Sequence, residues 1–543
     1  MRKLYLLRLV AGVSALAGLA CGAAETAAAG LAAAGRKPVI VNQAADAVVN
    51  YLKLEQRLGQ GATKEMVEAA MPLLVDQYQG LGVTHIFWNV NYQRVGYRSA
   101  VWPSYWDDPD PEQNISSWPR SYYELHKLGI DDIFAVVIPR CREQHISPWI
   151  SLRMNDHHYT GNPTCVSELF RMHPELRTNK GKGLWDYTRP EVREFYLKLL
   201  VEVLQRYDVD GLELDWVRTP PRFEAAERER GRACLTEFVR AARRETQAAA
   251  GRRGHPVRLA VRVPDTPEFA LGMGFDAAGW AREGLVDMII PSGWWNGFED
   301  IPVEEWRTQL GAAAGECQIV PGTACTYACT KKGFMMDRNL AAMRGFVAAM
   351  FDRGADGLYL FNHFAPVQFN IKARTPEGQT FNECTQGDLL RAAGDPAAAI
   401  ASPRVHALAL HDQIPDQSAY RPPLPAALAP QQFLTFKLHT GPKPATGRYV
   451  LRVGLNQADG LAAAKLDLRL NGSACRALAD MPAPAKPELR LELPRQNTCE
   501  VAPRLLQFEA PLNAVARGYN TVELTLAQGQ AQTVVWLEAL LEP

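Results

Sequence analysis

A net charge is missing from this sequence. The 543 residues include 59 Lys and Arg and 59 Asp and Glu, so no overall field attracts the chain to nucleic acid or to an anionic membrane. Its ligand is therefore expected to be neutral or recognised locally. A long apolar run is also missing after residue 30, and a bilayer span needs about 20 such residues. We expect a mature chain that is tethered to a membrane, if at all, only at its start.

Motifs for metals and phosphates are scarce as well. Cys325 and Cys329 have no second Cys or His pair at zinc spacing, and structural zinc sites need four ligands. No Gly-rich phosphate turn follows an early strand, which argues against a doubly wound nucleotide-binding sheet. The ten cysteines permit disulfides in an exported chain, and Cys475 with Cys499 is the first pairing we expect. The sequence predicts no cofactor and no metal.

The N-terminal 30 residues have the layout of a secretory signal peptide. Arg2, Lys3 and Arg8 surround the apolar stretch Leu4–Leu19, and small residues follow. Export to the periplasm or the extracellular space is therefore expected, with a mature chain beginning near Cys21. Cys21 is also a candidate for acylation in a bacterial lipoprotein, although the three residues before it match the usual signal imperfectly.

Residues 37–370 alternate between short apolar runs and amphipathic stretches, the pattern of a parallel α/β fold. Eight strands are predicted: Val39–Asn42, Thr84–Asn91, Pro148–Met154, Gly211–Val217, Arg258–Val263, Val286–Pro291, Gln318–Gly322 and Gly357–Phe361. The helices predicted between them are Lys64–Gln79, Ile133–Glu143, Glu191–Tyr207, Ala233–Ala249, Phe275–Glu283, Glu304–Ala314 and Asn339–Arg353. Eight such units over about 330 residues predict a (β/α)₈ TIM barrel.

The pattern changes after residue 370. Residues 371–430 are rich in Pro and Ala and are predicted to be a connection. Residues 431–543 alternate without helices and predict an all-β sandwich. Its strands are Phe433–His439, Tyr449–Leu455, Lys465–Leu470, Glu488–Leu493, Leu505–Phe508, Thr521–Leu526 and Val534–Leu541. The run 517–524 resembles a strand entry in the jelly-roll modules of bacterial glycosidases, so the domain either supports the barrel or binds sugar.

Barrels carry their chemistry at the C-terminal ends of their strands, so the polar and aromatic residues there are the candidate site. Aromatic faces stack on sugar rings while amides and charges bind hydroxyls, so this mixture favours a carbohydrate ligand. The candidate substrate-binding residues are Trp88, Asn89, Asn91, Arg153, Asn155, His157, Arg218, Arg262, Trp294, Trp295, Asn296, Asn362 and His363. The candidate catalytic residues are Asp156, Glu213, Asp215 and Asp265.

The fourth strand carries two of these carboxylates. Side chains alternate along a strand, so Glu213 and Asp215 share one face while Leu212, Leu214 and Trp216 share the other. The apolar set is expected to face the helices, which directs both carboxylates into the barrel. Their α-carbons are expected about 6.6 Å apart, and like charges at that distance raise one pKa and divide the pair into donor and nucleophile or base.

A second interpretation of Glu213 stays open, in which Arg153 or Arg262 neutralises it and it only orders the site. A metal site formed by Asp156 with His157 and His158 is a further alternative. Adjacent histidines point in different directions on an extended chain, which disfavours it.

The run Asp210-Gly-Leu-Glu-Leu-Asp-Trp-Val-Arg-Thr-Pro220 resembles the signature of the family-10-like glycosyl hydrolases, which often have His where this chain has Glu213. Trp185–Arg193 is similar to the segment that precedes it in that family. Up to Asp215 the run is also similar to the family 18 chitinase motif, but Val217 stands where that family has its catalytic acid. The resemblance implies a TIM-barrel glycosidase without the chitinase acid.

Together these observations predict hydrolysis of a glycosidic bond in an extracytoplasmic oligo- or polysaccharide. Asp215 is expected to act as nucleophile or base, with Glu213, Asp265 or Asp156 as the acid. Their separation would distinguish retention, at about 5–5.5 Å, from inversion, at about 6.5–9.5 Å. The alternatives are a sugar-binding barrel without catalysis and a metal-dependent hydrolase.

Overall fold

The computed structural model divides into two compact units. The first comprises Met1–Trp216, Pro220–Val261 and Met273–Met288, and the second comprises Val217–Thr219, Arg262–Gly272 and Ile289–Pro543. The residues that the structure describes are 36–43, 63–107, 119–156, 158, 160–162, 165–178, 184–219, 223, 225–293, 299–324, 326–328, 335–337, 339–363, 367, 370–374, 380–408, 423–455, 463–482 and 504–543.

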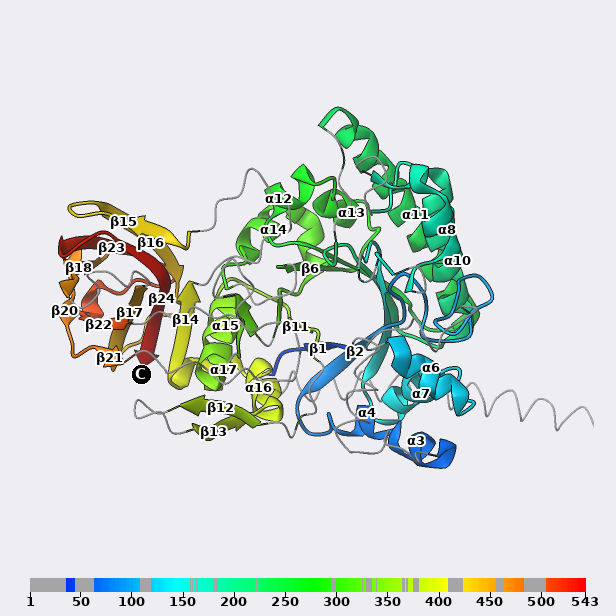
Figure 1. Ribbon diagram of the computed structural model, residues 1–543, viewed down its shortest axis with the longest axis horizontal. Coiled ribbons are helices and arrows are strands. Elements are labelled where there is room, and N and C mark those ends of the chain that lie inside the picture. The colour runs from blue at the N-terminus through cyan, green and yellow to red at the C-terminus, as the bar shows by residue number, and fades with distance from the viewer. Residues whose placement is uncertain are drawn as a thin grey trace, which may run out of the picture. The chain divides into compact units, whose positions relative to one another are not determined.

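Eight parallel strands close into a barrel, which confirms the predicted fold (Figure 1). In sheet order they are β5 (Arg258–Pro264), β4 (Gly211–Asp215), β3 (Ser147–Arg153), β2 (Val83–Asn89), β1 (Val39–Gln43), β11 (Leu358–Phe361), β8 (Gly322–Ala324) and β6 (Met288–Ser292), which pairs again with β5. The seventh predicted strand forms in two pieces, because β7 (Gln318–Ile319) ends before Pro321, whose ring nitrogen has no hydrogen to donate.

Helices follow the strands as the apolar periodicity predicts. They are α3 (Lys64–Ala70), α4 (Leu73–Asp76), α6 (Pro119–Lys127), α7 (Phe134–Glu143), α8 (Glu168–Met172), α10 (Pro190–Arg206), α11 (Arg228–Arg253), α12 (Pro267–Gly272), α13 (Ala277–Arg282), α14 (Val303–Leu310) and α15 (Leu340–Asp352). Side-chain caps start several of them: Thr63 accepts from the Met66 amide, and Asn339 accepts from the Ala342 amide. The predicted helix 64–79 forms as two short helices, separated at Pro72. Among the described residues, no helix has the length and apolarity of a bilayer span.

The segment predicted as a connection contains regular structure. It includes β12 (Asn370–Arg374), β13 (Thr380–Thr385), α16 (Gln386–Ala393), α17 (Pro396–Ala401) and β14 (Arg404–Leu408). A capping box formed by Thr385 and Asp388 starts α16. β14 already belongs to the sandwich, since it pairs antiparallel with β24 (Gln532–Glu542).

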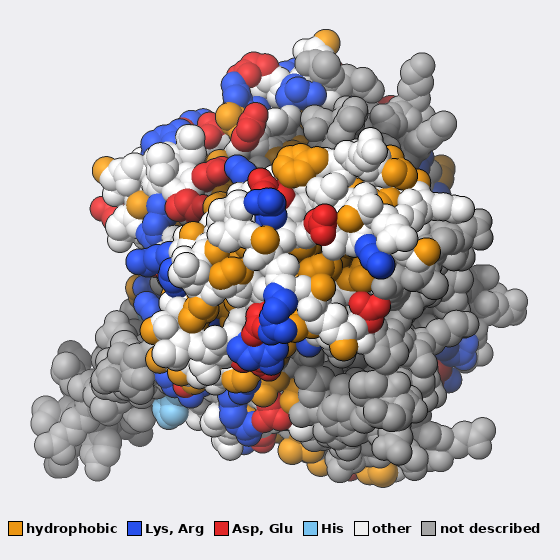
Figure 2. Space-filling model, turned by 90° about the vertical axis from the view of Figure 1, so that its left-hand side faces the viewer, with side chains coloured by type: hydrophobic (Ala, Val, Ile, Leu, Met, Phe, Trp, Pro, Cys, Tyr) orange, Lys and Arg blue, Asp and Glu red, His pale blue; other side chains and the backbone are white. Residues whose placement is uncertain are grey.

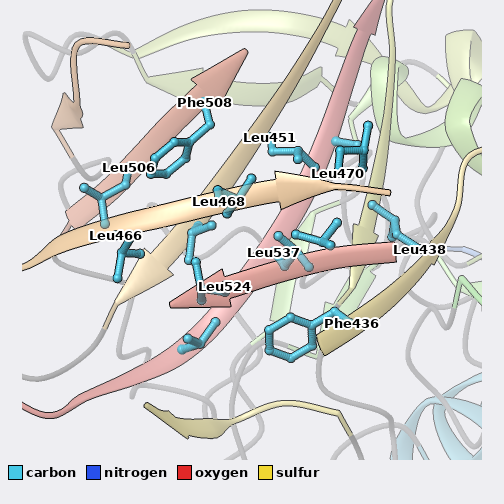
Figure 3. Packing of buried hydrophobic residues seen from close by; sticks show 14 of the residues in the cluster. Phe436, Leu438, Leu451, Leu466, Leu468, Leu470, Leu506, Phe508, Leu524 and Leu537 are labelled. Carbon is cyan, nitrogen blue, oxygen red and sulfur yellow. The ribbon is translucent and has the colours of Figure 1, made fainter. Parts of the chain in front are cut away.

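Two antiparallel sheets form the C-terminal sandwich. One runs β14-β24-β17-β22-β20, with β17 at Arg448–Leu455, β22 at Arg504–Ala510 and β20 at Arg476–Ala477, and the short β15 (Ala426–Leu428) and β21 (Met481–Pro482) pair at its side. The other runs β16-β23-β18-β19, with bounds Phe433–His439, Tyr519–Gln528, Lys465–Leu470 and Ser473–Ala474. The predicted strand 488–493 lies outside the described residues. Every second side chain of β18 is buried, as the alternation predicts, and these leucines pack with Phe436, Leu451, Phe508 and Leu537 in the core (Figure 3).

Helix α15 packs directly against strand β14 (Figure 1). A Cβ added to Gly345 would lie 1.8 Å from the carbonyl oxygen of Val405, so only glycine permits this approach. Gly441, with φ +65°, also approaches α15 closely, because a Cβ there would lie 2.9 Å from the carbonyl oxygen of Ala348. On the face drawn in Figure 2, basic and acidic side chains are interleaved with apolar ones, in keeping with the balanced charge.

Candidate functional site

The register of β2, β3 and β4 places polar side chains in adjacent rows on one face of the sheet. Asn89 pairs with Ser151, which pairs with Glu213, and one level further along the strands Arg153 pairs with Asp215. None of these five residues is more than 2 % exposed. Because paired residues of parallel strands point to the same side, the row of Asn89, Ser151 and Glu213 and the row of Arg153 and Asp215 both face the barrel interior.

An aromatic layer lies next to this row, toward the start of the strands. Phe87 pairs with Trp149 and Trp149 with Gly211, and the Phe87 and Trp149 rings stack at 4.6 Å with an interplanar angle of 9°. A Cβ on Gly211 would lie 2.4 Å from the indole of Trp149, so the missing side chain makes room for that ring. The packed rings bound the polar part of the interior on one side.

The opposite face of β4 confirms the predicted alternation. Trp216 packs in an aromatic cluster with Tyr187 at 5.0 Å, Phe238 of α11 at 6.0 Å and Phe275 at 5.7 Å between ring centroids. This places the apolar residues of β4 against the helices, so Glu213 and Asp215 point inward.

Trp88 lies on the helix side of β2, away from the interior row. It pairs in register with Gln43, whose amide donates to the Tyr78 hydroxyl beyond α4. Burial raises the pKa of Cys141 on α7 to about 12, and a hydrogen bond with Trp88 opposes that rise. The structure therefore separates Trp88 from the interior residues with which the sequence grouped it.

Asp156 is the centre of a buried ionic cluster after β3. Its Oδ2 atom lies 3.0 Å from Nη1 of Arg153, and its Oδ1 atom accepts from the His158 backbone amide at 2.7 Å and lies 2.5 Å from Nδ1 of His158. The Arg153 guanidinium also stacks 4.2 Å from the ring centroid of Tyr92. Asp156 thus forms an ion pair with Arg153, the residue that pairs with Asp215 in the register of β3 and β4.

Three of the predicted asparagines, Asn89, Asn91 and Asn155, hydrogen-bond to the backbone of other segments. The side chain of Asn91 makes two hydrogen bonds to the last residue of β3. Its Oδ1 atom accepts from the Arg153 backbone amide at 3.0 Å, and its Nδ2 atom donates to the Arg153 carbonyl at 3.1 Å. Asn155 accepts from the Trp185 amide at 3.0 Å, and Asn89 donates to the Ser151 carbonyl at 3.2 Å. Their geometry assigns at least one polar group of each amide to holding the backbone.

Further polar atoms of this interior have no hydrogen-bond partner among the described residues. They are Nδ2 and Oδ1 of Asn42, Oδ1 of Asn89, Oγ of Ser151 and Nδ2 of Asn155. Such buried atoms cost about 1–3 kcal/mol each, and in native structures they mark bound water or a functional site. Asn42 and Ser151 were not predicted. The pairing of Asn42 with Phe87 puts it on the interior face, and the same count of alternating positions could have found it from the sequence.

In the second unit, Arg262 of β5 is fully buried and spans the interior. Its guanidinium lies 3.6 Å from the ring centroid of Phe361 on β11, a strand that is not adjacent to β5. It also donates to Oγ of Ser292 at 3.1 Å and to the Gly293 carbonyl at 2.9 Å. The start of the segment after β6 is therefore fixed by a buried cation.

The other predicted residues of this unit lie at strand ends. Asp265 is buried, and its carbonyl accepts from Nε1 of Trp306 on α14 at 2.8 Å. His363 is 1 % exposed, and burial lowers its pKa to about 4, so the ring is neutral near pH 7. Arg218 is buried, and Asn362 has a φ of 51°.

His157, Trp294, Trp295 and Asn296 lie outside the described residues. Within the described part of the chain, no three His, Cys, Asp or Glu residues are grouped as metal ligands. Cys475 is half-buried, and Cys21, Cys325, Cys329 and Cys499 lie outside the described residues.

The chain matches no family model and no curated relative. Solved glycoside hydrolases are among the structures similar to it. A family GH18 chitinase from Chromobacterium violaceum is 10% identical, with a TM-score of 0.37, over 93% of this chain and 88% of that chain. The PgaB (BpsB) glycoside hydrolase domain from Bordetella bronchiseptica is 11% identical, with a TM-score of 0.35, over 60% of this chain and 93% of that one.

A cycloisomaltooligosaccharide glucanotransferase from Paenibacillus sp. is 10% identical, with a TM-score of 0.32, over 92% of this chain. The chain spans 57% of that protein, and 49% of an alpha-L-fucosidase from Paenibacillus thiaminolyticus. These likenesses assign no family to the chain.

Proposed function

We propose that the protein hydrolyses glycosidic bonds, with Asp215 as nucleophile or base. The observation that carries this proposal is the pair of buried carboxylates, Glu213 and Asp215, on the interior face of β4 where the strand ends. Arg153 and Ser151 flank them in the register. A glycosidase needs two carboxyl groups on either side of the scissile bond, held at a strand end where a substrate can enter.

The acid partner is best sought in Glu213 or Asp265. Asp156, the third candidate, is ion-paired with Arg153 and accepts two further bonds from His158. Protonating Asp156 would break its buried ion pair with the Arg153 guanidinium, which is unfavourable. We therefore assign Asp156 the role of holding Arg153 beside Asp215.

The test is turnover on a panel of algal, plant and host glycans. Asp215→Asn and Glu213→Gln keep the side-chain shape and remove the charge. Loss of a nucleophile or of a general base lowers kcat by at least about 100-fold. Asp467→Asn, the same change on the exposed face of β18, is the matched control and should keep full activity. Full activity of Asp215→Asn on a substrate that the wild type cleaves would refute the assignment.

A barrel that binds sugar without cleaving it is the second candidate, favoured by the engagement of Asp156 with Arg153. It predicts calorimetric binding of glycans with no reducing ends released. A metal-dependent hydrolase using Asp156 and His157 predicts instead that chelators abolish turnover.

Export belongs to the same proposal. Residues 1–30 would direct the chain out of the cytoplasm, and Cys21 would carry a lipid if the chain is a lipoprotein. Incorporation of labelled palmitate into the wild type, and its loss in Cys21→Ser, would establish the anchor. Release of an unlabelled mature chain would refute it.

A further inference from the structure

A buried arginine joins the C-terminal end of α15 to the start of α14. The side chain of Arg353 is 1% exposed. Its Nη1 atom donates to the Ile301 carbonyl at 2.7 Å and lies 2.8 Å from Oδ1 of Asp300, and its Nε atom lies 3.3 Å from Oε2 of Glu304. One guanidinium therefore fixes the segment that enters α14.

The sandwich completes this cluster with Tyr519, the first residue of β23. The Arg353 guanidinium lies 4.9 Å from the Tyr519 ring centroid and donates to its hydroxyl. The hydroxyl in turn donates to Oδ1 of Asp300 at 2.7 Å. Tyr519 thus contacts Arg353 and Asp300, which lie 166 and 219 residues before it in the sequence.

Helix α14, whose start Arg353 contacts, is hydrogen-bonded to the residue that follows β5. Trp306 of α14 is 1% exposed, and its indole nitrogen donates to the carbonyl of Asp265 at 2.8 Å. Asp265 directly follows β5 and precedes α12. An indole enclosed by packing and bonded to a backbone carbonyl transmits a displacement of its helix to that backbone, because closely packed groups have few alternative positions.

We propose that Tyr519 and Arg353 are positioning residues for Asp265, acting through α14 and Trp306. The sandwich then sets the geometry of a strand end in the barrel, in addition to covering α15. The positioning itself does not depend on catalysis. Only its consequence for turnover rests on the proposed function, in which Asp265 is a candidate acid.

A second contact of the sandwich with α15 provides the matched control. Arg517 pairs with Asp352 at 2.9 Å, one residue before Arg353, but neither residue contacts α14 in any bond that the structure describes. Arg517→Met therefore removes an arginine between the same domains and leaves the connection to α14 intact.

The experiment is hydrogen–deuterium exchange of the full-length protein, followed in the peptide 262–272. Arg353→Met is expected to speed exchange of the α12 amides by about 5- to 30-fold. Tyr519→Phe, which keeps the ring but removes the bond to Asp300, is expected to show a smaller increase in the same peptide. Arg517→Met should leave that peptide unchanged.

Unchanged exchange in Tyr519→Phe and Arg353→Met would overturn the proposal, as would an equal increase in Arg517→Met. If Arg353→Met does not fold, the comparison of Tyr519→Phe with Arg517→Met decides alone. Once a substrate is known, a fall in kcat without a change in KM in Tyr519→Phe would link the positioning to catalysis. Altered exchange with unaltered kcat would leave the positioning intact and remove Asp265 from the reaction.

Discussion

The approach of α15 to β14 leads to a prediction in which the same substitution destabilises the protein at one helical glycine and not at another. In Gly345→Ala the new Cβ would lie 1.8 Å from the Val405 carbonyl oxygen, whereas such contacts are not shorter than 3.0 Å. The helix and the strand must therefore separate by about 1.2 Å, and overpacking of this kind costs about 1–3 kcal/mol. Because both partners are backbone, we take about 3 kcal/mol, which the better helix propensity of Ala reduces by up to about 1 kcal/mol.

A net loss of about 2 kcal/mol corresponds to a Tm about 4–8 °C lower for a cooperative unit of 150–250 residues. Gly251→Ala is the control, because Gly251 lies in α11 with nothing within 4 Å of its added Cβ. This variant gains the higher helix propensity of Ala and meets no steric clash, so its Tm should be equal to or slightly above that of the wild type. The assay is thermal unfolding followed by circular dichroism at a fixed scan rate. Equal Tm values for Gly345→Ala and Gly251→Ala would refute the reasoning.

Three further predictions concern the barrel interior. Burial holds the pKa of His363 at about 4, below its ordinary 6.5, so the stability it contributes is complete above pH 6.5 and is lost as the pH falls toward 4, by up to about 3 kcal/mol. Denaturant unfolding at several pH values should show this slope, and His363→Gln should flatten it; an unchanged slope would contradict the burial argument. Asp156→Asn should destabilise the fold by about 3–5 kcal/mol, measured as a lower Tm, because it breaks the buried ion pair of Asp156 with Arg153; a Tm within 1 °C of wild type would show that this ion pair contributes little to stability. Gly211→Ala places a Cβ 2.4 Å from the Trp149 ring and should lower stability by about 1–3 kcal/mol in the same assay, whereas a neutral result would mean that the indole can move.

The barrel strands were predictable because their information is local. Each buried strand is a short apolar run between helices, and alternation alone placed Glu213 and Asp215 inside and Trp216 outside. The same alternation, applied to β2 and β1, separates Trp88 from Asn89 and brings Asn42 to the interior. The positions of Trp88 and Asn42 therefore follow from alternation along the strand, and distance from the strand end alone does not indicate them.

Other features depend on contacts that no local pattern contains. The ion pair of Asp156 with Arg153 requires a particular turn after β3, and the closed cluster around Arg353 joins three separate segments. Helix α16 is an intermediate case. Its capping box at Thr385 and Asp388 is visible in the sequence, but the composition of the surrounding segment favoured a connection.

The pairing of β24 between β14 and β17 has a consequence for the order in which the sandwich can be made. Strand β14 leaves the ribosome about 130 residues before β24, and during synthesis it has no other long strand of its sheet beside it. The seven-stranded sheet is therefore complete only after residues 532–542 have emerged, and until then the strand that packs on Gly345 of α15 lacks the strand with which it pairs. Over this interval the backbone hydrogen-bonding groups of β14 stay unpaired, and a frameshift or stop codon before β24 would leave the strand beside α15 in that state.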